Sequence, residues 1–269
     1  MNHKRVYTII GIILIFIIWL LISLIIDEQK LIFPGPIETI AYLKFLLVKK
    51  STYTSILITI MKTLIGFLIS LFFALILGII SGLNKIIKKH QSKNNLTINT
   101  TDKIKLVLNP IITVFKAVPT ASVLFLFLVI AGVKNAPIFV VILISLPVLY
   151  DSVVGGMENI PKELKDVTRL ESGKKLSTIL KIYIPLAANY IIVGITSAFG
   201  LAYKVEIMSE ILTGDTTLGN GIGVAIHNVQ INEVNMTPIF AWTLIAIILL
   251  LIINFLANLI KTKMKKNIL

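Results

Sequence analysis

Three ionisable residues stand close together at the end of an apolar stretch. Lys204, Glu206 and Glu210 follow residues 182–203, which carry no charge and end in Tyr203. Charged side chains at membrane depth are costly and usually face a bundle interior or a water-filled cavity. On a regular helix Glu206 and Glu210 share one face, whereas Lys204 points about 200° away from Glu206. These residues are therefore candidates for the lining of a path that a charged solute could follow.

Lys204 cannot easily neutralise Glu206 on a regular helix, which leaves three arrangements. The helix breaks near this point, the carboxylate faces an aqueous cavity, or a cation from another helix, such as Lys134, approaches it. A fourth interpretation is structural: the polar stretch marks the wetted outer end of the helix. The sequence of this stretch does not decide between these four arrangements of Glu206.

Other residue patterns exclude the common kinds of catalytic and cofactor site. His3, His90 and His227 are far apart and form no His-x-x-x-His or Glu-x-x-His pair, so a metal site has no support. The Gly-x-Gly-x-Gly stretch at 219–223 lacks the βαβ context of a dinucleotide site, and no Gly-x-Ser-x-Gly elbow or P-loop lysine motif occurs. We expect no metal, no cofactor and no enzymatic activity in this chain.

The composition is that of an integral membrane protein. The 269 residues are 56% hydrophobic and 14% charged, with a mean hydropathy of +0.93. Uncharged runs long enough to cross a hydrocarbon core of about 30 Å are predicted to be membrane helices. They are residues 7–26, 63–83, 182–203 and 234–260. Two shorter runs, 117–133 and 135–150, can span by extending through flanking residues. The fold class is therefore all-α, with about six transmembrane helices, the first kept as an anchor rather than cleaved as a signal peptide.

Basic residues indicate the orientation of these helices. The net charge of +13 could suggest nucleic acid, but no soluble module with base-reading groups is evident. Most Lys and Arg residues fall instead in four segments between or beside the spans, at 4–5, 85–105, 162–181 and 261–266. The positive-inside rule then predicts that both termini are cytoplasmic. Lys62, near the outer end of the second helix, is expected to reach the lipid headgroups.

Three prolines are placed to interrupt membrane helices. Pro119 removes a backbone donor early in the third helix, and Pro147 is expected to make a similar break in the fourth. Pro185 is placed to kink the fifth helix near its start. Such breaks need protein or water to satisfy the carbonyl that is left without its donor.

Residues 161–185 form a charged segment between two apolar spans. Its apolar positions recur at helical spacing, as in a short amphipathic helix that Gly173 can end. These positions are Ile160, Leu164, Val167 and Leu170. An ordinary cytoplasmic loop is the plainer interpretation of such a segment.

The same segment resembles the EAA loop of binding-protein-dependent ABC importer permeases. Asp166-Val167-Thr168 stands for Glu-Ala-Ala, and Pro185 follows Asp166 at the nineteen-residue spacing of the family pattern. The match is imperfect, because Ser172 takes the usual Gly position and Gly173 follows one place late. The resemblance continues through 31–36, 108–110 and 116–119 to the final span.

This resemblance implies a coupling helix that docks on a separate cytoplasmic ATPase. The residues carried over to that role are Glu163, Asp166, Val167, Thr168, Arg169, Ser172, Gly173 and Pro185. Two such loops engage two ATPase subunits, so a second permease copy is implied, most simply in a homodimer. An extracytoplasmic substrate-binding protein would deliver the substrate, and ATP hydrolysis would reside on the partner chain.

The resemblance also favours a substrate path that includes an aqueous cavity. The residues assigned to this path are Pro119, Tyr203, Lys204, Glu206 and Glu210. Within the family the chain is most similar to the nitrate, sulfonate and taurine branch, which implies a small anion or zwitterion, or a pyrimidine precursor of thiamine. The alternative function is an ion-coupled secondary transporter that uses Glu206, Glu210 and Asp151, although no inverted repeat is visible.

The whole chain is predicted to be one permease domain, residues 1–269, in a bacterial plasma membrane. Its parts are an N-terminal helix at 7–26, a core at 53–260 and a coupling loop at 157–185.

Overall fold

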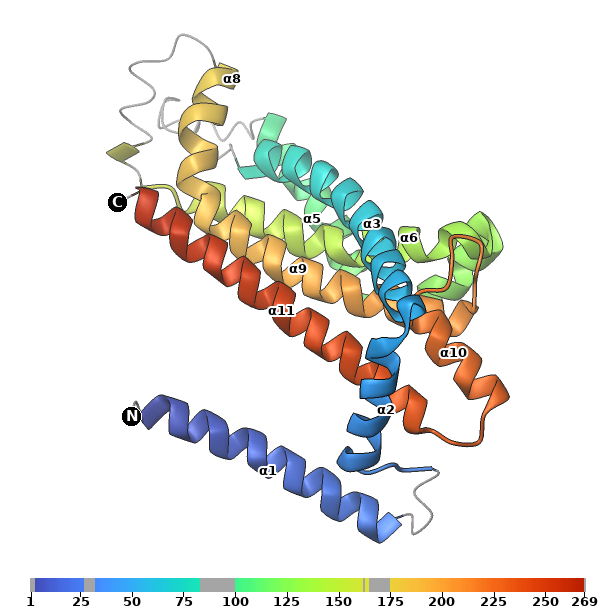
Figure 1. Cartoon of the computed structure of the whole chain (residues 1–269). Helices are drawn as coiled ribbons and strands as arrows, with labels where there is room; N and C mark the ends of the chain where they lie inside the picture. The colour runs from blue at the N-terminus through green and yellow to red at the C-terminus, as the bar shows by residue number, and fades with distance from the viewer. Residues whose placement is uncertain (1–2, 27–31, 83–99, 162, 165–174, 269) are drawn as a thin grey trace. The chain divides into compact units, whose positions relative to one another are not determined.

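The structure is a computed structural model that describes residues 3–26, 32–82, 100–161, 163–164 and 175–268 (Figure 1). Within these residues the regular elements are all helical, so the all-α prediction is confirmed. The helices are α1 (His3–Ile26), α2 (Pro36–Val48), α3 (Lys50–Gly82), α5 (Thr100–Ala117), α6 (Thr120–Glu158), α8 (Lys175–Thr178), the π-helical η2 (Ile179–Tyr183), α9 (Ile184–Thr213), α10 (Ile222–Asn232) and α11 (Thr237–Ile268).

Five helical segments of the described part are long and apolar enough to cross a membrane. They are Val6–Ile26, Lys50–Gly82, Thr120–Glu158, Ile179–Thr213 and Thr237–Leu259. Four of them overlap the longer predicted spans, with ends that differ by a few residues in two cases. The two shorter predicted spans, at 117–133 and 135–150, fall together on α6.

α6 accounts for both short spans because it folds back on itself at Gly132. This residue has φ 77° and ψ 166°, a conformation that glycine adopts without a steric penalty. The rings of Phe127 and Phe139 stack with centroids 5.3 Å apart, whereas a straight helix would hold their Cα atoms about 18 Å apart. α6 is therefore a hairpin of two arms, residues 120–131 and 133–158.

The three prolines act differently. Pro119 is extended (φ −63°, ψ 125°) and separates α5 from α6, so the predicted interruption is confirmed. The break predicted at Pro147 is wrong, because Gly132 is the residue inside α6 that leaves helical geometry, and buried packing keeps the backbone helical around Pro147. Before Pro185 the chain forms a π-helical turn, in which the Ile184 N–H donates to the Ile179 carbonyl.

The first compact unit comprises Met1–Thr59 and Ile207–Leu251. Trp19 of α1 donates a hydrogen bond to the carbonyl of Pro34 (3.1 Å) and stacks on Phe240 of α11. These contacts anchor the end of α1 that precedes α2. The buried core of the unit joins α2, α10 and α11, and it consists of Leu46, Ile222, Ile226, Ala241, Trp242 and Ile245.

The second compact unit comprises Ile60–Glu206 and Ile252–Leu269. Small residues let α3 approach α6 closely, as is common between membrane helices. A Cβ atom at Gly78 would lie 2.7 Å from Cβ of Val153, and one at Gly66 would lie 2.9 Å from Cβ of Val141. The fully buried core around this contact includes Leu124, Val140, Val141, Leu149 and Tyr150.

Candidate functional site

α9 carries the predicted path residues near its C-terminal end. The helix runs without interruption from Ile184 to Thr213, so the break considered near Glu206 does not occur. Tyr203, Glu206 and Glu210 are each at most 1% exposed, whereas Lys204 is exposed. The interpretation of a wetted helix end is therefore wrong for both carboxylates, because protein covers them.

Glu210 and Thr59 together cap the start of α10 in the first unit. The Thr59 hydroxyl and the Gly223 N–H each donate to Glu210 Oε2, at 2.8 Å and 2.9 Å. The Ile222 N–H donates to Thr59 Oγ1 at 2.8 Å. A helix N-terminus presents N–H groups without intrahelical partners and favours nearby negative charge. Glu210 thus stabilises the chain entering α10.

Glycines make this contact possible. A Cβ atom at Gly221 would lie 2.0 Å from Glu210 Oε1, and one at Gly223 would lie 2.5 Å from Glu210 Cβ. Gly219, with φ 101°, turns the preceding loop. The glycines at 219–223 therefore serve a tightly packed turn.

Glu206 lies in the second unit, at the level of Lys62. α3 and α9 run in opposite directions there (Figure 1), and the rings of Phe67 and Phe199 meet at 5.2 Å. From this contact the helical rise places Lys62 about 7.5 Å along α3 and Glu206 about 10.5 Å along α9, toward the same end. Lys62 is 6% exposed, so its predicted reach to the headgroups is wrong. Lys62 and Glu206 are thus two buried side chains of opposite charge at a similar depth of the second unit.

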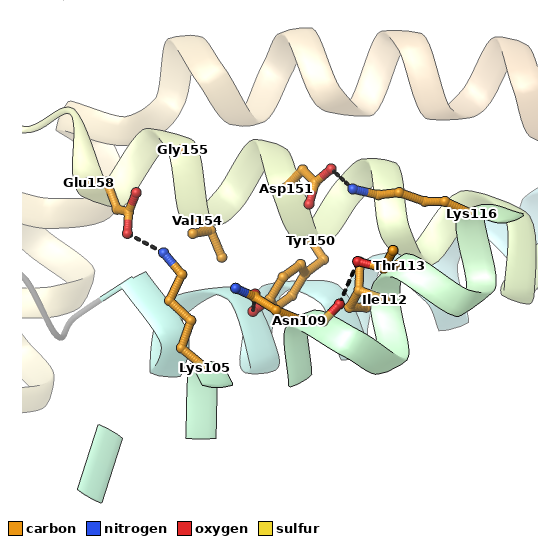
Figure 2. Close-up of a pocket in the computed structure, with 10 residues that line it drawn as sticks. All are labelled: Lys105, Asn109, Ile112, Thr113, Lys116, Tyr150, Asp151, Val154, Gly155 and Glu158. Carbon is orange, nitrogen blue, oxygen red and sulfur yellow. Dashed lines mark hydrogen bonds and ion pairs between the residues drawn. The ribbon is translucent and has the colours of Figure 1, made fainter. Parts of the chain in front are cut away.

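A polar groove of about 400 Å³ lies between α5 and the second arm of α6 (Figure 2). Charged and polar side chains from both helices point into it. Its lining consists of Lys105, Asn109, Ile112, Thr113, Lys116, Tyr150, Asp151, Val154, Gly155 and Glu158. We use "the groove" for this set of residues.

Two ion pairs cross the groove. Lys105 pairs with Glu158, and Lys116 pairs with Asp151. Between them the Tyr150 hydroxyl lies 3.5 Å from Asn109 Oδ1. The side chains of Lys116 and Asp151 are 46% and 50% exposed, about twice the exposure of Lys105 and Glu158 (27% and 20%). The groove therefore holds one shielded pair and one that solvent reaches readily.

Sequence reasoning did not find the groove, although a signal was present. Lys105, Asn109 and Lys116 recur at the spacing of one helix face, and Asp151 and Glu158 stand two turns apart on another. In the sequence, Lys105 and Lys116 are explained equally well by positive-inside charge and by the family motif, and Asp151 by an ion site. The groove depends in addition on the antiparallel pairing of the two helix faces, which one sequence does not reveal.

Most residues assigned to the coupling loop lie outside the described residues. These are Asp166, Val167, Thr168, Arg169, Ser172 and Gly173. Glu163 is exposed in a short described stretch with Leu164, and Pro185 is exposed beside the π-helical turn. Pro119 is exposed at the break between α5 and α6. The roles of all these residues stay predictions.

The sequence profile of the family described as "Binding-protein-dependent transport system inner membrane component" matches residues 96–266. The chain belongs to this family. That stretch includes the groove, the predicted coupling loop and the path residues on α9, whereas Thr59 and Lys62 of α3 precede it.

Similar proteins agree with this membership. The nitrate import permease NrtB of Leptolyngbya laminosa is 28% identical over 155 residues, 56% of this chain and 54% of that protein. NrtB of Synechococcus elongatus is 25% identical over 214 residues, 75% and 70% of the two chains. The first alignment thus spans about half of the relative's length.

The fold also matches a solved transporter. A chain of the MetNI methionine ABC transporter, in an inward-facing conformation, superposes with a TM-score of 0.59 and 18% identity, covering 76% of this chain and 94% of that one. The predicted fold of a type I ABC importer permease is therefore confirmed.

Proposed function

We propose that this chain is the permease subunit of an ATP-driven importer for a small anionic or zwitterionic solute. The family match over residues 96–266 carries this proposal. The likeness to two nitrate import permeases supports a small polar solute, and a sulfonate, taurine or a thiamine precursor remain within the same class. The chain supplies the route and the conformational coupling, and ATP hydrolysis resides on a partner chain.

The proposed assembly contains two permease copies, two cytoplasmic ATPase subunits and an extracytoplasmic binding protein. Both termini and the segment 161–185 face the cytoplasm of a bacterial cell, as the distribution of basic residues predicts. The coupling contact involves the stretch from Glu163 to Gly173, and Pro185 ends the segment at the start of α9.

Cross-linking tests this coupling directly, because the chain has no native cysteine. Cysteines introduced at Lys165 or Arg169 are expected to cross-link to the ATPase, with a yield that changes with nucleotide. A cysteine at Tyr53 serves as the control. Tyr53 is exposed, and the predicted topology places it on the outer side of the membrane, away from the ATPase. Equal yields at all three positions, or none at 165 and 169 in an active complex, would reject the coupling role.

The proposed path includes Pro119, Tyr203, Lys204, Glu206 and Glu210. Because Glu206 and Glu210 are buried, we assign them to holding the wall of the path in place. Because Lys204 is exposed, we assign it to direct contact with an anionic group of the solute. Lys204→Met should lower uptake in vesicles that contain the full complex.

Lys134→Met is the matched control for this test, because Lys134 is also exposed but lies beside the turn of α6. Both rates are normalised to assembled complex. Equal uptake by the two variants would remove Lys204 from the path.

A further inference from the structure

The charges that line the groove sum to zero and are matched pair by pair. Two lysines from α5 face two carboxylates from α6, and each lysine contacts one carboxylate (Figure 2). Asn109, Thr113 and Tyr150 add neutral hydrogen-bonding groups between the pairs. A volume of about 400 Å³ lies within the usual range of small-molecule sites. The groove thus offers one cation and one anion at each end.

Such a lining discriminates between an anion and a zwitterion. An anion that binds Lys116 must displace Asp151, and the displaced carboxylate then lies beside the bound negative charge, where like charges repel. A zwitterion replaces both halves of the ion pair, because its anionic end takes the lysine and its cationic end takes the carboxylate. Specificity arises from the unmatched charge that the wrong ligand leaves behind.

The two pairs are not equivalent in this respect. Lys116 and Asp151 are about half-exposed, and an exposed ion pair contributes little net free energy, so a ligand can replace it at small cost. Lys105 and Glu158 are more shielded and hold α5 against α6. The exchangeable pair is therefore Lys116 with Asp151.

We propose that the groove binds a small zwitterion, with its anionic group on Lys116 and its cationic group on Asp151. This inference rests on the proposed transport function and specifies the solute class that this surface accepts. Thr113, one turn from Lys116 on α5, faces the same ligand. Lys105 and Glu158 keep the groove in shape and stay paired when the ligand binds.

A thiol-protection experiment on the full-length chain in lipid nanodiscs tests the proposal. The variant Thr113→Cys places the only thiol of the protein in the groove. β-Alanine and propionate are matched probes that differ in the ammonium group. Millimolar β-alanine is expected to slow labelling by a methanethiosulfonate reagent at least threefold, and propionate or nitrate at the same concentration is expected to leave the rate unchanged.

Control variants separate ligand binding from folding. Lys103→Cys is exposed on α5 outside the groove and should show no protection. Adding Lys116→Met or Asp151→Asn to the Thr113→Cys variant should abolish protection, and the charge-swapped double variant Lys116→Asp/Asp151→Lys should restore it. Adding Lys103→Met, which removes an exposed lysine of α5 outside the groove, should keep protection.

Several outcomes would overturn the proposal. Equal protection by propionate or nitrate would make the groove an anion site, and no protection by any probe would mean that the groove binds none of them. Persistent protection after Asp151→Asn would remove the cationic contact. Because the assay needs neither ATPase nor binding protein, these failures leave the proposed importer function standing, whereas absent ATP-dependent uptake by the full complex would reject that function alone.

Discussion

The Thr59 hydroxyl donates a hydrogen bond to Glu210 Oε2 across 151 residues of sequence, and both side chains are buried. The same hydroxyl oxygen accepts the Ile222 N–H. Thr59→Val keeps the shape of the side chain but removes both interactions. We expect this variant to lower the free energy of unfolding by about 1–3 kcal/mol, the cost of buried polar groups that lose partners.

Thr54→Val is the control for that prediction. Thr54 lies on the same helix, is exposed, and its hydroxyl bonds only to the Ser51 carbonyl one turn earlier. Its replacement should change stability by no more than about 0.5 kcal/mol. Thermal unfolding in the same detergent compares the two, and equal midpoints would show that the Thr59–Glu210 contact adds no stability.

Gly78 tests the close approach of α3 to α6. Gly78→Ala places a Cβ atom 2.7 Å from Cβ of Val153, so the helices must separate. We expect a loss of about 1–3 kcal/mol, as for other overpacked cores. Gly155→Ala on α6 meets nothing within 4 Å and should be neutral or slightly stabilising. Partial rescue by Val153→Ala would show that the clash is the cause.

A substitution at Gly132 tests the effect of backbone strain alone, because a side chain there would meet no neighbouring atoms. A Cβ atom there would meet no atom within 4 Å, yet φ 77° with ψ 166° is strained for any other residue. Gly132→Ala should therefore cost about 1–3 kcal/mol although the site is open. Stability unchanged from that of Gly155→Ala would mean that α6 turns without needing this conformation.

Double-mutant cycles should rank the two ion pairs of the groove. The more shielded Lys105–Glu158 pair is expected to show a coupling energy of about 1 kcal/mol or more, and the half-exposed Lys116–Asp151 pair less than about 0.5 kcal/mol. Met replaces each lysine and the amide replaces each carboxylate. Raising the salt concentration should weaken the second coupling more than the first. The reverse ranking would contradict the division into a shielded and an exchangeable pair.

The sequence predicts those features of the fold that depend only on residues close together in the chain. Uncharged runs identify the spans, and the four-residue spacing of Glu206 and Glu210 places them on one face. Pro119 and Pro147 have the same local chemistry, however, and only the packing around each decides that the first breaks a helix and the second does not. Helix periodicity says nothing about which distant element covers a residue.

The same limit explains what was missed at the candidate site. Thr59 is unremarkable in sequence, and its relation to Glu210 depends on a contact 151 positions away. Lys116 and Asp151 stand 35 residues apart, and they meet only because α6 reverses at Gly132. Contacts between residues so far apart in the chain are set by the assembled fold. A single sequence therefore shows the residues of the groove but not which of them pair.

The hairpin of α6 has a consequence for how the chain enters the membrane during synthesis. The first arm, residues 120–131, extends only about 18 Å, less than the hydrocarbon thickness of about 30 Å. An insertion machinery that examines one segment at a time would not retain this arm. We therefore expect the first arm to enter the bilayer together with residues 133–158, and a nascent chain that stops near Asn135 to leave this arm outside the bilayer.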